Sequence, residues 1–528
     1  MFSAKSNAAP VFIALALLLA SALPPSAPTP EPVRPSIFRS PKEPTPMRIQ
    51  HWQQDHFRSP NQYLQKEKGD FYSLDAFIPA RDGQRLERMP TWTGHIDFAS
   101  NFVEPKGAFY DPDNPLDNYF VFVGTSEATS PQDTLGVMTI SQSALTASGL
   151  SSVGDASTTD WLALSGLHKQ NLLWYNTDFW VIPSSDECFK VAGYTGGSRT
   201  KVYNGDAVAI LPARDTLYLV TDDDDIYRWD PDASAFELYY ETWMDLDIQH
   251  VIPYRNDLLI FSKPTDGALT IHQLPDRPPA DLRQLIRVPT ESAQFVAPSA
   301  NGTFGTPWVI HDDRIYFSPG IYWTDSNDAE VLPIWRFDGN SVELVENVEP
   351  PIVPNAWGLV QWRGRLLLYL VGSSAQYLYA YHGGRFVQVL DSAFTCAAWS
   401  DVYSLAGQLW MPYEDAGTQG WTHLEDFEDS VFISSWLDMG RPGVQKHLLS
   451  VAAVVSDAVE DFNVKLEYRT ESGSWTTAAN TDDARHIIGE DLGVDFYLLQ
   501  LRVTLDDDTG DNEDIALESL GATYSYGR

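Results

Sequence analysis

A strand–turn–strand pattern recurs through the middle of the chain, and it constrains the fold more than any other feature. Each copy is an apolar strand, a short polar turn and a second strand that opens with an aliphatic residue. A unit repeated at this interval is typical of architectures in which neighbouring units bury one another's apolar faces. The copies occupy residues 162–176, 208–222, 250–263, 307–320, 357–372 and 399–413. Their aliphatic residues are spaced 45, 41, 57, 51 and 43 residues apart, at Leu172, Leu217, Leu258, Ile315, Leu366 and Leu409.

Several copies continue into a second hairpin, in which an aromatic-rich strand, an Asp, Gly, Asn or His turn and an alternating strand follow one another. It is clearest at residues 225–241, 333–347 and 377–391. Four antiparallel strands per unit predict the blades of a β-propeller, because one sheet cannot cover both of its apolar faces alone. Residues 94–127 resemble an earlier, degenerate blade, so we expect about seven blades, with six as the alternative. A β-sandwich or a solenoid is the competing architecture, and the lack of helical periodicity disfavours a helix-rich fold.

After residue 428 the pattern changes to longer alternating strands. The stretch "FNVKLEYRT" (462–470) places apolar and polar residues on opposite faces, and "YLLQLRVTL" and "LGATYSYG" behave alike. Strands of this length over about 100 residues predict a small β-sandwich at 429–528. The residues expected to face inward are Phe462, Val464, Leu466, Tyr468, Leu499, Leu501, Val503, Leu505, Leu520, Ala522, Tyr524 and Tyr526.

Between these two patterns lies "SWLDMGRPGVQKHLLSV" (435–451), a basic spot in an acidic chain. We interpret 432–440 as an edge strand that leaves the propeller, 440–443 as a corner, and 446–456 as the first long strand of the sandwich. Glycine and proline at the corner supply permissive and fixed φ angles. On this reading the three basic residues, Arg441, Lys446 and His447, offset nearby carboxylates and form no active site.

The amino-terminal segment has a composition of its own. An apolar run (11–20), the small residues of 20–22 and the upstream Lys5 have the outline of a secretory signal peptide, and a proline-rich linker follows to Pro46. Alternatively translation starts at Met47, and residues 1–46 do not belong to the natural product. No other stretch is long and apolar enough to predict a membrane span. Residues 47–95 then form an extended amino-terminal arm, and the propeller occupies 96–428.

Charge and cysteine content exclude several classes of function. The formal net charge is −37, which repels phosphate backbones and argues against nucleic-acid binding through a basic patch. The two cysteines, Cys188 and Cys396, are far apart and lack metal-ligand spacing, so we expect free buried thiols, or a single bridge in an oxidising compartment.

Two sets of motifs resemble tailed-phage virion proteins. The corner W-x-D-x-G-x-P-G-x-x-K at 436–446, followed by "YRTESGSWTT" and a closing "ATYSYG", is similar to the end of virion proteins in which a propeller-like body carries a sandwich. The stretch "SLDAFIPARDGQRLERMPTW" (73–92) resembles the opening of phage nozzle and tail-hub proteins, with its DG-x-x-x-x-R-x-P turn. The resemblance implies a structural subunit of a tail or neck, held in a ring by neighbouring copies. A signal peptide would depart from this family.

Only one residue suggests catalysis. Asp111, followed by Pro112 in "AFYDPDNP", resembles the first-blade Asp-Pro of arabinanase-like and xylosidase-like glycosidases. Hydrolysis of a glycosidic bond needs a second carboxylate across the cavity. No partner glutamate can be chosen from the sequence, and an aspartate before proline is also common in turns. We therefore predict no catalytic residue.

The other polar motifs favour structure over chemistry. The acidic runs 221–227 and 505–516 could gather oxygen ligands for calcium, but neither has the spacing of a calcium loop, so solvated turns are expected. The stretch 470–475 resembles the Asp-box hairpin of sialidases without its aspartate, and we interpret it as an ordinary hairpin. Three isolated histidines (His95, His382, His486) do not have metal-ligand spacing. We predict no cofactor and no metal site.

These observations favour a non-enzymatic virion component whose partners are copies of itself and neighbouring virion proteins. A secreted β-propeller glycoside hydrolase or carbohydrate-binding protein, with an extracellular location, is the alternative that the signal-like start and Asp111 would support. A bacterial surface binding module lies between the two.

Overall fold

The computed structural model of the chain is all-β. Every described element is a strand, and the described part of the chain holds no helix that could span a bilayer. Strands β2 to β41 lie in one compact unit, Ile49–Tyr526. The signal-like segment 1–46 lies outside the described residues. These are 48–54, 59–60, 70–80, 84–97, 102–111, 119–126, 134–141, 172–182, 187–192, 199–242, 246, 248–262, 269–275, 282–288, 308–318, 323–324, 330–349, 351, 356–371, 375–392, 402–415, 418–424, 429–456, 462–482, 485–507 and 515–526.

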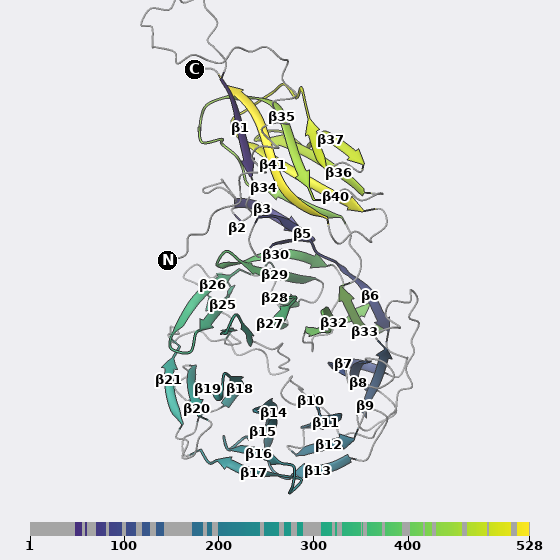
Figure 1. Cartoon of the computed structure of the whole chain (residues 1–528), viewed down its shortest axis with the longest axis vertical. Helices are drawn as coiled ribbons and strands as arrows, with labels where there is room; N and C mark the ends of the chain where they lie inside the picture. The colour runs from purple at the N-terminus through teal and green to yellow at the C-terminus, as the bar shows by residue number, and fades with distance from the viewer. Residues whose placement is uncertain are drawn as a thin grey trace, which may run out of the picture. The chain divides into compact units, whose positions relative to one another are not determined.

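Seven antiparallel sheets follow one another around a ring (Figure 1). Blade 1 comprises β7 (Phe102–Asp111), β8 (Tyr119–Ser126) and β9 (Thr134–Ser141), and blade 2 comprises β10 (Leu172–Tyr175), β11 (Asp178–Val181), β12 (Cys188–Ala192) and β13 (Arg199–Tyr203). Blade 3 comprises β14 (Ala207–Ala213), β15 (Thr216–Thr221), β16 (Ile226–Asp230) and β17 (Ala235–Tyr240). Blade 4 comprises β18 (Ile248–Tyr254), β19 (Asp257–Ser262), β20 (Thr270–Leu274) and β21 (Arg283–Arg287).

The remaining blades complete the ring. Blade 5 comprises β22 (Trp308–His311), β23 (Arg314–Phe317), β24 (Trp323–Thr324), β25 (Glu330–Phe337) and β26 (Val342–Val348). Blade 6 comprises β27 (Ala356–Trp362), β28 (Arg365–Val371), β29 (Gln376–His382) and β30 (Arg385–Ser392). Blade 7 comprises β31 (Tyr403–Leu405), β32 (Gln408–Asp415), β33 (Thr418–Leu424) and the early strand β6 (Trp92–Asp97). The fold is therefore the β-propeller that the repeats predict, with the larger of the two expected blade numbers.

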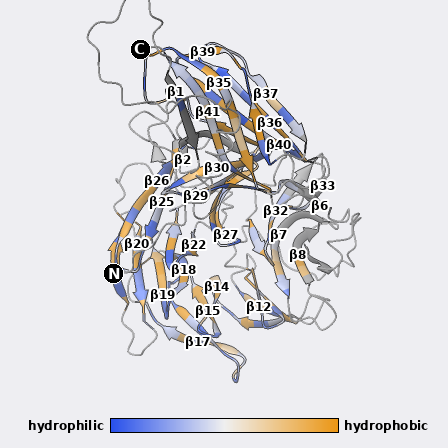
Figure 2. Ribbon diagram, turned by 45° about the horizontal axis from the view of Figure 1, so that its top comes forward, coloured by the Kyte–Doolittle hydropathy of each residue, from blue (hydrophilic) through white to orange (hydrophobic). Residues whose placement is uncertain are grey.

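The blades stack because their second strands are apolar on both faces. Every residue of β15 is buried, and β19 and β28 are buried after their first residue. The outer strands β17 and β21 are largely exposed or half-buried. Figure 2 shows the blades of the ring coloured by hydropathy, except where residues are drawn in grey. A strand that is apolar on both faces needs another sheet on each side to keep both faces from water. The ring supplies these neighbours, because each blade lies between two others.

Aromatic contacts join blade 1 to both of its neighbours. The rings of Phe109 and Phe179 lie 5.7 Å apart between blades 1 and 2, and those of Phe120 and Trp410 lie 5.3 Å apart between blades 1 and 7. Strand β6, which precedes blade 1 in the sequence, pairs with β33 as the last strand of blade 7. The ring is thus closed by a strand from the opposite end of the propeller sequence.

Tight turns between the first two strands of successive blades contact one another. Both turn residues have positive φ angles in several of them, such as Asp312 (48°) and Asp313 (57°), as type I′ hairpins require. In the blade 3 turn, Arg214 donates its Nε–H to the backbone oxygen of Asn256 in blade 4 (2.8 Å). Between blades 4 and 5, the hydroxyl of Tyr254 donates to the backbone oxygen of Asp313 (2.6 Å). These bonds tie the blades together at the turns.

The repeat prediction is wrong in blade 2 by one strand. Leu172 begins the first strand of that blade, and the residue equivalent to Leu217 is Phe179, which follows the turn at Asn176 and Thr177. The apolar run before residue 172, which lies outside the described residues, resembles a first strand in sequence. When Phe179 replaces Leu172 in the alignment, the aligned residue is buried in all six repeats: Phe179, Leu217, Leu258, Ile315, Leu366 and Leu409.

Two further sheets form the predicted β-sandwich. One sheet has the order β2 (Ser59–Pro60), β3 (Asp70–Asp75), β34 (Ser430–Ser434), β40 (Leu499–Asp507), β36 (Phe462–Thr470) and β37 (Thr476–Asp482). The other has the order β38 (His486–Gly489), β35 (Lys446–Val455), β41 (Ala516–Tyr526), β5 (Leu86–Arg88) and β4 (Phe77–Pro79), with β1 (Arg48–Gln54) on β41 and β39 (Val494–Phe496) on β35. All twelve residues expected to face inward are buried.

The sandwich is not made from the carboxyl-terminal residues alone. Strands β3, β4 and β5, from the segment 47–95 that the sequence predicts as an arm, are integral to its two sheets. Strand β34, expected to be an edge strand of the propeller, instead pairs with β3 and β40. The prediction for β34 was wrong because pairing with a segment some 360 residues away in sequence leaves no local signal.

One hydrophobic core runs from the ring into the sandwich. Among its members, Leu367 lies in blade 6, Phe77 and Leu86 lie on the amino-terminal strands, and Leu448 and Val503 lie in the two sheets of the sandwich. The amino-terminal strands β4 and β5 therefore pack into the core of both modules.

Candidate interaction site

A cluster of arginine and tryptophan side chains lies on the outer face of the sandwich sheet that contains β36 and β40. Strand alternation buries Leu466 and Tyr468 and turns Lys465 and Arg469 outward. We call the site the Arg–Trp cluster, and it comprises Trp436, Lys465, Glu467, Arg469, Trp475 and Arg502.

Each guanidinium in the cluster packs on an indole ring. The Cζ atom of Arg469 lies 5.1 Å from the ring centre of Trp436 and 4.7 Å from that of Trp475. The Cζ atom of Arg502 lies 4.6 Å from the ring centre of Trp475. Arginine over tryptophan is a favourable cation–π arrangement, worth on the order of 0.5–1 kcal/mol where exposed. The two arginines are therefore held in place on rigid rings.

Buried polar groups beneath the cluster fix Arg469 further. Its Nε–H donates to Oε1 of Gln500 (2.7 Å), and Gln500 donates its side-chain amide to the backbone oxygen of Ser434 (2.8 Å). Gln500 and Ser434 are fully buried. Arg469 is half-buried, and the bond to Gln500 uses its Nε–H and neither of its Nη groups.

Glu467 is the one carboxylate in the cluster, and its side chain is only 5% exposed. It accepts from Nε and Nη2 of Arg502 at 2.5 Å and from Nζ of Lys465 at 3.1 Å. Two cations therefore bind this carboxylate, and Arg469 shares Trp475 with Arg502, so the cluster holds three cationic side chains and one carboxylate on a chain of charge −37. Positioned guanidinium N–H donors in a positive setting are suited to bind carboxylates.

The sequence shows only part of this site. Alternation in 462–470 predicts that Lys465, Glu467 and Arg469 share a polar face. Nothing in the sequence places Trp436 or Trp475 over that face, because each lies beyond a strand end on a different hairpin. The cluster was not among the predicted candidate sites.

The basic corner residues have structural contacts. Lys446 is 1% exposed, and its Nζ donates to the backbone oxygens of Arg441 (2.9 Å), Val444 (2.8 Å) and Tyr497 (3.3 Å). Burial lowers the pKa of this lysine. Nδ1 of His447 lies 2.8 Å from a carboxylate oxygen of Asp495, so this residue does lie against a carboxylate, as the sequence predicts. Lys446 differs from the prediction, because its partners are backbone carbonyl oxygens.

The corner itself joins β34 to β35 and therefore links the two sheets of the sandwich. Met439, Gly440 and Gly443 have φ angles of 55°, 69° and 73°, so the backbone enters the left-handed region there, as a sharp bend requires. The interpretation of this stretch as a structural corner agrees with these contacts, but the corner does not separate propeller from sandwich.

The acidic run 221–227 divides into buried anchors and exposed tips. Asp224 accepts the backbone N–H groups of Leu246 (2.6 Å) and Ile248 (3.0 Å), and Asp225 accepts that of Thr242 (2.9 Å). Asp222 and Asp223 are exposed. The run thus fastens blade 3 to the start of blade 4 and presents two carboxylates to solvent.

Asp111 is the last residue of β7, opposite Tyr119, and is 5% exposed. Pro112 lies outside the described residues. In the second acidic run, only 505–507 and 515–516 are described, at the end of β40 and the start of β41. The stretch 470–475 joins β36 to β37, and the Gly473 N–H donates to the Thr470 oxygen at 3.0 Å, as in an ordinary hairpin.

The remaining predicted residues are dispersed. His95, His382 and His486 belong to blade 7, blade 6 and the sandwich, so the structure does not bring them together. No group of metal-ligating side chains occurs among the described residues. Cys188 is a buried free thiol whose pKa is raised by burial, and Cys396 lies outside the described residues.

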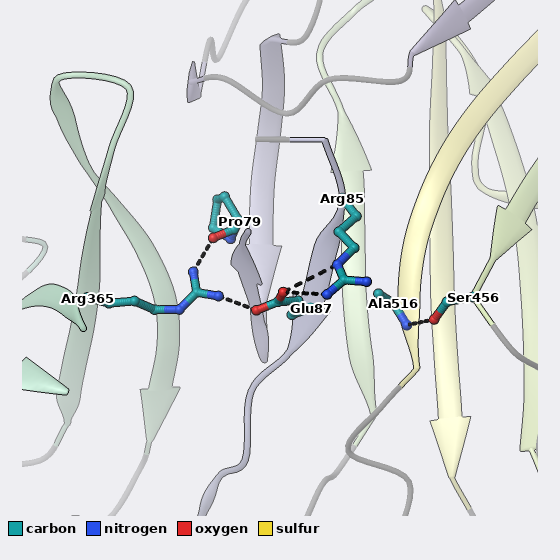
Figure 3. Close-up of polar contacts among 6 residues, drawn as sticks. All are labelled: Pro79, Arg85, Glu87, Arg365, Ser456 and Ala516. Atoms are coloured by element: carbon teal, nitrogen blue, oxygen red, sulfur yellow. Dashed lines mark hydrogen bonds and ion pairs between the residues drawn. The ribbon is translucent and has the colours of Figure 1, made fainter. Parts of the chain in front are cut away.

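A polar joint connects blade 6 to the amino-terminal strands (Figure 3). Arg365, at the start of β28, donates to the backbone oxygen of Pro79 and to the carboxylate of Glu87. Glu87 also accepts from Arg85 at 3.1 Å. On the same sheet, the Ala516 N–H donates to Oγ of Ser456 at 2.8 Å. The joint adds directional contacts to the shared hydrophobic core.

No family model and no curated protein matches the chain. Among solved structures it is similar to the WD40 domain of Toxoplasma gondii coronin, at 11% identity and a TM-score of 0.41 over 63% of this chain and 84% of that one. It is also similar to the amino-terminal domain of Nup159, at 8% identity and a TM-score of 0.40 over 63% and 95% of the chains. BBS1N, in its complex with ARL6DN, matches at 9% identity and a TM-score of 0.40 over 64% and 97%. Likenesses this weak carry no argument about function.

Proposed function

We propose that the chain is a non-enzymatic structural subunit of a tailed-phage virion. It would belong to the tail, neck or nozzle and assemble in a ring with copies of itself and with neighbouring virion proteins. The proposal follows from the motif resemblance of the corner and the amino-terminal segment, together with the construction of the molecule.

The continuous core is the observation that carries the proposal. Blade 6, strands β4 and β5 and both sheets of the sandwich share buried residues, and Arg365 bonds to Pro79 and Glu87 across the joint. Modules connected by linkers move independently by default, whereas modules that share a core move together. A subunit that must hold neighbours at a fixed distance in an assembly needs this rigidity.

The acidic side chains of blade 3 also favour a structural role. The carboxylates of Asp224 and Asp225 accept hydrogen bonds from backbone N–H groups and so hold neighbouring segments of the chain in place. A catalytic carboxylate would instead face a substrate with its acceptors open.

Particle composition tests this proposal. Particles purified from a culture that produces the chain should contain it as a stoichiometric protein by mass spectrometry, and antibodies should label the tail or neck in electron micrographs. Its absence from intact particles would contradict the proposal.

The secreted glycoside hydrolase or carbohydrate-binding protein remains the second candidate because Asp111 is buried at the end of the first strand of blade 1. Incubation with a glycan panel tests it. Release of sugar by the natural protein, lost in Asp111→Asn with unchanged thermal stability, would replace the structural proposal.

A further inference from the structure

We propose that the Arg–Trp cluster binds the exposed carboxylates of Asp222 and Asp223 on a second copy of this chain. The inference rests on the proposed function and specifies which surfaces meet in the ring. We call Asp222 and Asp223 the Asp tip.

The cluster presents donors suited to carboxylates. Arg469 is held by Gln500 through its Nε–H and by two indole rings, so neither Nη group is used in the bond to Gln500. A guanidinium fixed in this way loses little side-chain entropy when it binds a planar acid. Both tryptophans already pack against guanidinium groups, which disfavours a sugar ring stacked on the same faces.

The Asp tip presents acceptors on a rigid loop. The Asp222 N–H donates to the Asp206 oxygen at 2.8 Å, and the Asp224 N–H donates to the Thr221 oxygen at 3.0 Å. Asp224 is anchored to Leu246 and Ile248, so the loop is bonded on both sides of the tip. Four successive carboxylates repel one another, and a cationic partner would relieve that repulsion.

The positions of the two surfaces favour contact between copies. The Asp tip lies on blade 3, and the sandwich joins the ring at blade 6, with blades 4 and 5 between them on the shorter arc. Two different, complementary surfaces make a heterologous contact, and repetition of such a contact around an axis closes a ring. The charges of the two surfaces are opposite, as a docking contact between copies requires.

Charge-reversal variants of each surface test the contact. R469E reverses the charge at Arg469, while Arg502 and Lys465 still neutralise the buried Glu467. D222R/D223R reverses the charge of the Asp tip, while Asp224 keeps its hydrogen bonds to Leu246 and Ile248. In sedimentation velocity at low salt, the natural chain should form a discrete oligomer. Each variant should weaken assembly by at least about tenfold, because like charges would then face each other.

Mixing gives the sharpest result. R469E retains an intact Asp tip for the intact cluster of D222R/D223R, and its reversed cluster faces the reversed tip of the other variant with opposite charge, so an equimolar mixture should regain assembly beyond the dimer. Matched controls carry comparable charge changes on exposed residues elsewhere: R283E on β21 for the cluster, and E237R/E241R in blade 3 for the tip. Both controls should assemble as the natural chain does, and near-ultraviolet circular dichroism should confirm that all variants are folded.

The outcomes separate this inference from the proposed function. An oligomer that survives both reversals overturns the inference and leaves the structural role standing. If the natural chain is monomeric at every concentration and is found in no virion, both the inference and the proposed structural role are wrong. Loss of binding to immobilised polyuronate in R469E, with assembly intact, would overturn the inference in favour of a glycan site.

Discussion

Four successive aspartates in blade 3 have two different roles because of where the backbone N–H groups lie. Asp224 has a φ angle of 64° and accepts two N–H groups from the connection to blade 4, while Asp222 and Asp223 remain exposed. A buried donor that loses its acceptor costs about 1–3 kcal/mol, whereas an exposed carboxylate costs little to replace.

Asp224→Asn should therefore lower the free energy of unfolding by about 2 kcal/mol, since the amide keeps the shape of the side chain but only one accepting oxygen. Asp223→Asn removes the same charge at the neighbouring exposed position and should change stability by less than about 0.5 kcal/mol. Urea unfolding of both variants provides the comparison. Equal effects would mean that charge, and not the backbone anchor, explains the result.

Single residues also show why the candidate sites were only partly predictable. The sequence indicates that Lys446 lies in a basic spot, but its three carbonyl partners include Tyr497, which is distant in sequence. The Arg–Trp cluster was missed for the same reason: Trp436, Arg469 and Arg502 come from three separate strands or turns. Local alternation predicts which face a residue occupies, and only tertiary pairing determines what it meets.

At the scale of strands, the amino-terminal segment contributes to three different sheets. Strands β3, β4 and β5 complete the two sheets of the sandwich, and β6 completes blade 7. Each would otherwise leave an open edge, which is a site for aggregation. The repeats and alternating strands predict blades and sandwich well, because their signals are local. The pairing of β3 with β34 and of β6 with β33 has no local signal, and the sequence did not predict either pairing.

A fragment of residues 429–528 should consequently fail to fold cooperatively, since it lacks β3–β5 and exposes the apolar faces that Phe77 and Leu86 cover. The matched fragment, in which residues 70–90 are joined to it by a flexible linker, should regain a cooperative thermal transition and near-ultraviolet circular dichroism. If the fragment without residues 70–90 unfolds cooperatively and is equally stable, strands β3–β5 are not needed for the sandwich to fold, and the prediction is wrong.

At the scale of the whole molecule, ring and sandwich share one core and one polar joint. Heat should therefore unfold Ile49–Tyr526 as one cooperative unit, even though it holds two architectures that often occur as separate domains. Two-state behaviour of this kind depends on the contacts between modules being comparable with those inside them.

Differential scanning calorimetry of the full chain tests that central claim most directly. The shared core predicts a single main transition, which Arg365→Met and Phe77→Ala shift to lower temperature as a whole. Two separate transitions in the natural chain, of which these variants moved only one, would contradict it.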